Sequence, residues 1–176
     1  IDVDVSHDNK YLAIAEINTA GAVLQSNVKI ISVEKAQTNP DDPVEYVYSA
    51  SPKDVLLNIK YQEHNRLICM YDGSIHAIQN KKDEELVNLS DSNTFFADIE
   101  LKNAILRIKE ESTGLFKARS TVSLINVASK KENIYHIDSV IKEVYCSGGV
   151  VAANLGSEVH FINSNGWLIK KYISSQ

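Results

Sequence analysis

Four short segments of one form recur along the chain, and they constrain its fold more than any other feature. In each, an aliphatic residue is followed by a polar residue or His, an apolar residue, an Ile and a small polar or amide residue. Alternation with a period of two is typical of a β-strand that is buried on one face. The four segments are 28–32, 75–79, 122–126 and 159–163.

A turn signal and a second apolar run precede each of these segments. The turns are centred on Asn9, Asn65, Asn103 and the pair Gly148 and Gly149. Asn and Gly most readily adopt the positive φ that tight hairpin turns require. We therefore expect each turn to join two antiparallel strands.

Two further apolar runs flank each pair, so every repeat contains four predicted strands. The first strands are expected at 3–5, 55–59, 95–99 and 140–144, and the last at 44–48, 85–89, 134–137 and 168–173. Helix signals are nearly absent; 53–61 could form a short amphipathic helical turn, but it lies where the repeat requires a first strand.

Repeats of about 40 residues with four strands each are typical of the blades of a β-propeller. The sequence therefore predicts an all-β chain, with one propeller domain or fragment over 1–176. Its four four-stranded antiparallel blades are expected at about 1–50, 51–91, 92–138 and 139–176. A β-sandwich or an open meander is the alternative, but a sandwich has no reason to repeat at a fixed period.

The connection between the second and third strands alternates in length from blade to blade. It is long at 18–27 and 111–120, and it is a tight turn at 72–73 and 155–156. Ser26 in the first long connection recurs as Ser120 in the second. This two-blade period leads to the hypothesis that the chain is half of a larger ring, which two copies would complete about a twofold axis.

Two segments carry a resemblance to known propeller families. Val5-Ser6-His7-Asp8-Asn9-Lys10-Tyr11-Leu12-Ala13 resembles the S-P-D-G-K-x-L-A turn of WD-type and TolB-type repeats, with His7 in place of Pro and Asn9 in place of Gly. Residues 150–172 are similar to a blade of quinoprotein-like propellers, in which a Gly-containing turn leads to Trp, here Trp167. The Trp-Asp dipeptide and the His-containing tetrad of WD repeats are absent.

As a whole, the chain most resembles uncharacterised, membrane-anchored propeller proteins of Gram-positive bacteria. The resemblance implies a propeller outside the cell, anchored by a segment outside this chain. The chain begins at Ile1 rather than Met, and 1–5 already has the pattern of a strand, so we expect a fragment. No apolar run approaches the roughly 18 residues of a membrane helix, so we expect no membrane contact by this segment itself.

Charge argues against nucleic acid as a partner. The formal net charge is -5, and acidic and basic residues are mixed along the chain without a basic stripe. A protein that binds a phosphate backbone normally carries such a stripe.

The two long connections are the best candidates for a binding surface. Apolar residues stand at their tips, Val23 and Leu24 in the first and Leu115 and Phe116 in the second. Apolar side chains on a protruding hairpin favour contact with a partner, although they could also fold back over a neighbouring blade or meet their equivalents in an oligomer. We expect a non-enzymatic binding or scaffold module that contacts an unidentified protein or peptide through this face.

No group of residues has the spacing of a known catalytic, metal or cofactor site. There is no Gly-x-Ser-x-Gly elbow, no phosphate-binding glycine loop, and no His-x-x-x-His or Cys-x-x-Cys spacing, so we expect no cofactor and no metal. Cys69 and Cys146 are expected to be buried free thiols. His76 and His160 are expected to be structural, and Trp167 to pack between blades.

Two other functions stay open at this point. The chain could belong to a quinoprotein-like or carbohydrate-active propeller enzyme whose site needs blades absent from this segment. It could also be a purely structural spacer or a subunit of a larger assembly.

Overall fold

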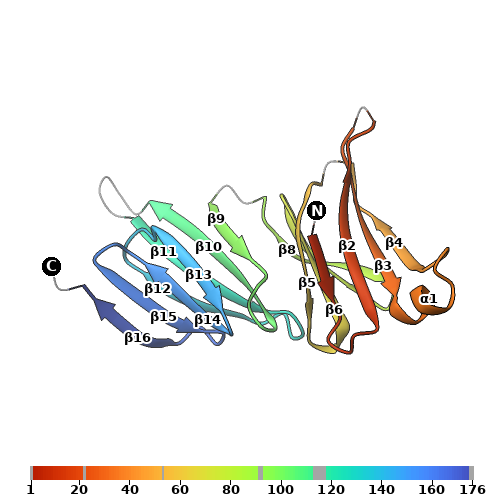
Figure 1. The fold of residues 1–176 in the computed structure, drawn as a ribbon. Coiled ribbons are helices and arrows are strands. Elements are labelled where there is room, and N and C mark those ends of the chain that lie inside the picture. The colour runs from red at the N-terminus through yellow and green to blue at the C-terminus, as the bar shows by residue number, and fades with distance from the viewer. Residues whose placement is uncertain (1, 22, 53, 91–92, 113–117, 175–176) are drawn as a thin grey trace. The chain divides into compact units, whose positions relative to one another are not determined.

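Figure 1 shows the computed structural model of the chain, which describes residues 2–21, 23–52, 54–90, 93–112 and 118–174. The chain divides into two compact units, Ile1–Ser90 and Asp91–Gln176. Each unit contains two sheets, and in each sheet four antiparallel strands follow one another in chain order. The predicted all-β fold of four four-stranded propeller blades is confirmed.

The strands are named blade by blade. Blade 1 comprises β1 (Asp2–Val5), β2 (Tyr11–Asn18), β3 (Gln25–Ser32) and β4 (Val44–Ser49), and blade 2 comprises β5 (Leu56–Gln62), β6 (Arg66–Tyr71), β7 (Ser74–Gln79) and β8 (Lys82–Asn88). Blade 3 comprises β9 (Thr94–Asp98), β10 (Ala104–Ser112), β11 (Ala118–Asn126) and β12 (Glu132–Ile137). Blade 4 comprises β13 (Glu143–Ser147), β14 (Val150–Asn154), β15 (Glu158–Asn163) and β16 (Leu168–Ile173).

The turns between the first two strands of each blade have the predicted backbone conformation. Asn9, Asn65 and Asn103 have φ angles of 58°, 53° and 58°, and Gly149 has a φ of 89°. A positive φ costs most residues energy but is tolerated by Asn and is free for Gly. These four positions therefore fix the hairpin that opens each blade.

A short helix, α1 (Val33–Thr38), follows β3, and the sequence pattern does not predict it. The Ser32 side chain caps it by accepting a hydrogen bond from the Lys35 backbone N–H (3.3 Å). None of its residues is buried. Six residues without an apolar face leave no periodic signal to detect. A 3-10 turn, η1 (Glu63–Asn65), links β5 to β6.

The predicted first strand of blade 4, 140–144, is wrong in its position. The strand β13 begins at Glu143, and the preceding residues form a lead-in segment. Ile141 in this segment is buried, with only 1% of its surface exposed, and its backbone N–H donates to the Ser120 hydroxyl (3.2 Å). The apolar run thus continues ahead of the strand because the lead-in is itself part of the core.

Each unit has a core between its two blades. In unit 1 the small side chains of Ala13 and Ala15 let β2 approach β5, where Ile59 and Tyr61 are buried. In unit 2 the core joins blades 3 and 4, with Leu124 and Val151 fully buried. Burial of each large aliphatic side chain contributes about 1.5–3 kcal/mol.

Polar contacts also tie the blades of a unit together. In unit 1 the carboxylates of Asp2 and Asp4 on β1 accept hydrogen bonds from the backbone N–H groups of Ile59 (2.9 Å) and Tyr61 (2.6 Å) on β5. The buried Ser26 hydroxyl accepts from the Leu56 N–H and donates to the Asp54 carbonyl, both at 3.0 Å. Three backbone N–H groups of β5 therefore find their hydrogen-bond acceptors in side chains of blade 1.

Candidate functional site

The β2–β3 hairpin, the first predicted binding element, extends beyond the other strands of unit 1 (Figure 1). Its strands remain paired up to Asn18 and Gln25. Beyond them, Val23 and Leu24 are exposed over 58% and 48% of their surfaces. These two side chains do not belong to the core cluster of unit 1, so they do not fold back over its blades. An exposed apolar pair on a protruding tip is available for contact.

The second predicted element is the β10–β11 hairpin. Its two strands pair from Ala104 and Asn126 up to Ser112 and Ala118. Leu115 and Phe116 lie outside the residues that the structure describes, so their role stays a prediction.

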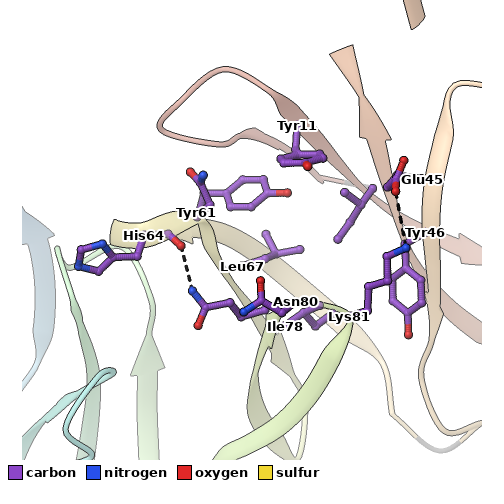
Figure 2. Close-up of a pocket in the computed structure, with 12 residues that line it drawn as sticks. Tyr11, Glu45, Tyr46, Tyr61, His64, Leu67, Ile78, Asn80 and Lys81 are labelled. Carbon is purple, nitrogen blue, oxygen red and sulfur yellow. Dashed lines mark hydrogen bonds and ion pairs between the residues drawn. The ribbon is translucent and has the colours of Figure 1, made fainter. Parts of the chain in front are cut away.

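Unit 1 also contains a pocket between blades 1 and 2, at the opposite end of β2 from the hairpin tip. The pocket has a volume of about 320 Å³, and we call it the tyrosine pocket. Figure 2 shows the Tyr61 side chain reaching across the pocket, with Tyr11 above it and Leu67 below. The lining residues are Tyr11, Ile30, Glu45, Tyr46, Tyr61, His64, Asn65, Leu67, Ile78, Gln79, Asn80 and Lys81.

Two turns whose residues have positive φ form part of the rim of the tyrosine pocket. His64, Asn65, Asn80 and Lys81 all have positive φ, between 52° and 61°. They are four of the seven non-glycine residues with positive φ in the described part of the chain. The Gln79 amide joins the two turns by donating to the His64 carbonyl (2.9 Å; Figure 2). Asn80 and Lys81 form the two-residue turn between β7 and β8, and a turn of this length commonly requires positive φ at both residues.

The charges at the mouth of the pocket are unequally matched. The Lys35 ammonium lies 2.6 Å from the Glu45 carboxylate, and this hydrogen bond lowers the pKa of Glu45 and raises that of Lys35. The Lys81 ammonium lies farther from Glu45, at 3.6 Å, and its side chain is 61% exposed. Two ammonium groups thus surround one carboxylate, and these three groups carry one net positive charge. Burial raises the pKa of the Tyr61 phenol, which therefore stays neutral.

Neither cysteine is suited to nucleophilic chemistry. Both are free thiols, as predicted; Cys69 on β6 is buried, whereas Cys146 on β13 is only partly buried rather than buried as predicted. Burial raises the pKa of Cys69 and raises that of Cys146 to about 12. The thiolate is the reactive form of cysteine, and a raised pKa lowers the fraction of thiolate near neutral pH.

The two histidines on third strands are held by structural contacts. His76 on β7 lies 3.0 Å from both the Asp83 carboxylate and the Ser74 hydroxyl. His160 on β15 lies 3.2 Å from the Tyr135 hydroxyl and from the Glu158 carboxylate. Among the described residues, no group of three or more His, Cys, Asp or Glu side chains is placed to hold a metal ion.

The predicted packing of Trp167 between blades is wrong. The residue is 71% exposed, in the turn that precedes β16. The Asn163 side chain holds the backbone of this turn by accepting a hydrogen bond from the Trp167 N–H (3.0 Å).

Similar proteins were found at the level of fold and of family. The tricorn protease matches 99% of this chain over 23% of its own length, with a TM-score of 0.52 and 9% sequence identity. The WD40 domain of Neurospora crassa Pan2 (TM-score 0.41, 7% identity) matches 98% of this chain and 49% of that one, and a protein of unknown function from Bacteroides caccae (TM-score 0.44, 16% identity) matches 93% and 58%. The chain thus spans less than two thirds of each.

A family model described as a family of unknown function, DUF5711, matches residues 1–175. No curated protein matches the chain. No helix in the described ranges is long and apolar enough to cross a membrane.

Proposed function

The chain belongs to DUF5711, a family of unknown function, and we propose from its own surfaces that it is a non-enzymatic module that binds a protein or peptide through the β2–β3 hairpin. The observation that carries the proposal is the exposed pair Val23 and Leu24 at the tip of this hairpin. A propeller presents rigid blades and variable connections, and binding residues are found mainly on such connections.

A phage-displayed library of random dodecapeptides, selected on the immobilised chain, tests this function. We expect selected peptides to bind the Val23→Ser/Leu24→Ser variant at least tenfold more weakly than the parent chain. That loss of about 1.4 kcal/mol is within the range for removal of two apolar contacts. Leu57→Ser is the matched control, because Leu57 is equally exposed (56%) but lies at the start of β5. Peptides that bind all three proteins equally would remove the hairpin as the site.

A second copy of the chain is the other partner that we propose, and it would complete a larger ring. Val159 and Phe161 on β15 hold the places that Val122 and Leu124 hold on β11. Val122 and Leu124 are fully buried in the core between blades 3 and 4. In blade 4 the corresponding face lines an open hollow of about 480 Å³ together with Val150, Ile169, Lys170 and Tyr172.

Blade 1 offers the matching surface for such a contact. Val3, Val5 and Val47 lie on the face of blade 1 that is turned away from blade 2. They are exposed over 52%, 46% and 46% of their surfaces. Contact of this face with blade 4 of another copy is head-to-tail, an arrangement that generates a ring when its rotation closes.

A location outside a Gram-positive cell, behind an anchor beyond this chain, is a companion proposal. It rests on the sequence resemblance described above. Labelling of intact cells with a membrane-impermeant amine reagent tests it, because lysines such as Lys82 are exposed and would react only in an extracellular protein.

A further inference from the structure

The tyrosine pocket is a second surface of unit 1 with the properties of a binding site. It is separate from the β2–β3 hairpin tip, since it opens where β2 begins and the tip lies where β2 ends. Its volume of about 320 Å³ lies at the lower end of the range for small-molecule sites, which is roughly 300–1,000 Å³. An occupant of about a dozen non-hydrogen atoms therefore fits.

The interior of the pocket favours a ligand whose inserted part is apolar. Leu67 and Ile78 are buried and form its floor, and Ile30 closes one side. The aromatic side chains of Tyr11 and Tyr61 stand over this floor (Figure 2). An apolar or aromatic group between them gains hydrophobic burial and ring contact.

The charged groups at the mouth of the pocket favour a ligand with a negative charge. The single carboxylate of Glu45 pairs with two ammonium groups, those of Lys35 (2.6 Å) and Lys81 (3.6 Å), so these three groups together carry one net positive charge. Lys81 carries an exposed ammonium group on the rim, in the turn between β7 and β8. A carboxylate that enters here exchanges the long contact between Lys81 and Glu45 for a direct ion pair.

We propose that the tyrosine pocket binds a small carboxylic acid with an apolar body. The carboxylate pairs with Lys81, and the body lies between the tyrosine rings and the floor formed by Leu67 and Ile78. The same chemistry is presented by a free aromatic acid and by the C-terminal residue of a peptide, and the experiment below distinguishes these two sources.

Three probes with one aromatic body test the charge preference: 3-phenylpropanoate, its amine counterpart 3-phenylpropylamine, and the peptide Gly-Gly-Phe with a free carboxyl group. Binding is followed by chemical-shift changes of backbone amides in the ¹⁵N-labelled chain at low salt. We expect 3-phenylpropanoate to shift the amides of Leu67, Ile78 and Lys81 and the amine to bind at least fivefold more weakly. Binding of Gly-Gly-Phe as tightly as the free acid identifies a peptide C-terminus as the source, and exclusion of the peptide identifies a free acid.

Lys81→Asn is the decisive variant. Asn tolerates the positive φ of position 81, so the charge is removed while the turn is kept. We expect the dissociation constant for 3-phenylpropanoate to rise about fivefold, as for the loss of a partly exposed ion pair. Lys130→Asn is the matched control, since Lys130 is an exposed lysine with a φ of 56° in a turn of unit 2.

Three results would overturn the proposal. The first is equal binding of the amine and the acid, the second is an equal effect of the two lysine variants, and the third is a set of shifted amides that lies outside the tyrosine pocket. None of them depends on the hairpin, so a failure at Val23 and Leu24 leaves this test intact.

Discussion

Ser26 and Ser120 make the same two hydrogen bonds in the two units. Each hydroxyl accepts from a backbone N–H that leads into the next blade, that of Leu56 (3.0 Å) or Ile141 (3.2 Å). Each also donates to a backbone carbonyl just ahead, that of Asp54 (3.0 Å) or Ser139 (2.8 Å). Both serines are buried, so no water replaces the hydroxyl when it is lost.

Replacement of either serine by Ala is expected to destabilise its own unit. Ser26→Ala leaves a buried N–H and a carbonyl without a partner, which costs about 1–3 kcal/mol. Urea denaturation measures the decrease in the free energy of unfolding. Faster hydrogen exchange at the Leu56 amide would show that the destabilisation arises at this hydrogen bond. Ser49→Ala, at an exposed position on β4, is the control. An unchanged exchange rate at the Leu56 amide would show that the Ser26 hydroxyl does not stabilise the start of β5.

The carboxylate of Glu132 is expected to make unit 2 sensitive to acid. A hydrogen bond with Ser123 and the neighbouring Arg107 guanidinium (2.9 Å) lower the pKa of Glu132. A lowered pKa in the folded state stabilises the fold above the unfolded value of about 4.3, and this contribution is lost as the pH falls through the folded pKa. Glu132→Gln should therefore lower the urea midpoint of unfolding at pH 7. As the pH falls, the midpoint of the variant should decrease less than that of the parent chain.

Glu111→Gln provides the comparison for this acid response, because Glu111 is an exposed carboxylate on β10 of the same unit. Its pH profile is expected to follow that of the parent chain. A Glu132→Gln profile parallel to the parent from neutral pH to acid would contradict the assignment.

Self-association through blade 4 is expected to depend on Tyr172. This residue is 59% exposed on β16 and lines the open hollow beside Phe161. Light scattering over a range of concentrations should show a dimer or a larger closed assembly for the parent chain. Tyr172→Glu should give the monomer mass, because a charge on the apolar face opposes its burial.

Tyr145→Glu is the matched control for this association. Tyr145 lies in the same blade, on β13, and is 63% exposed, but it does not line the hollow. A monomeric parent chain at every concentration would refute head-to-tail association, and equal loss in both variants would refute the role of this face.

The sequence predicts the blades well because their signals are local. Period-two alternation marks a strand such as β15 within a few residues, and Asn or Gly marks the turn ahead of it. The exceptions have equally local causes. The helix α1 is too short to show a period, and the buried lead-in at Ile141 has the same apolar character as the strand after it.

The tyrosine pocket could not be predicted in this way. Its walls come from strands and turns of both blades that are distant in the sequence, and Tyr11, Glu45, Tyr61 and Lys81 share no spacing that marks a site. Only the packing of blade 1 against blade 2 brings them together. The hairpin pair Val23 and Leu24 was accessible to prediction because both residues stand side by side in one loop.

The positive φ at Asn9, Asn65, Asn103 and Gly149 shows what the four blades have in common most strictly. The side chains around these turns differ, but the left-handed backbone recurs in every blade. The repeat is thus encoded in the handedness of the main chain more than in residue identity. A comparison that scores identical letters passes over such repeats in distant relatives, whereas one that follows the recurrence of Asn and Gly ahead of an alternating strand will find them.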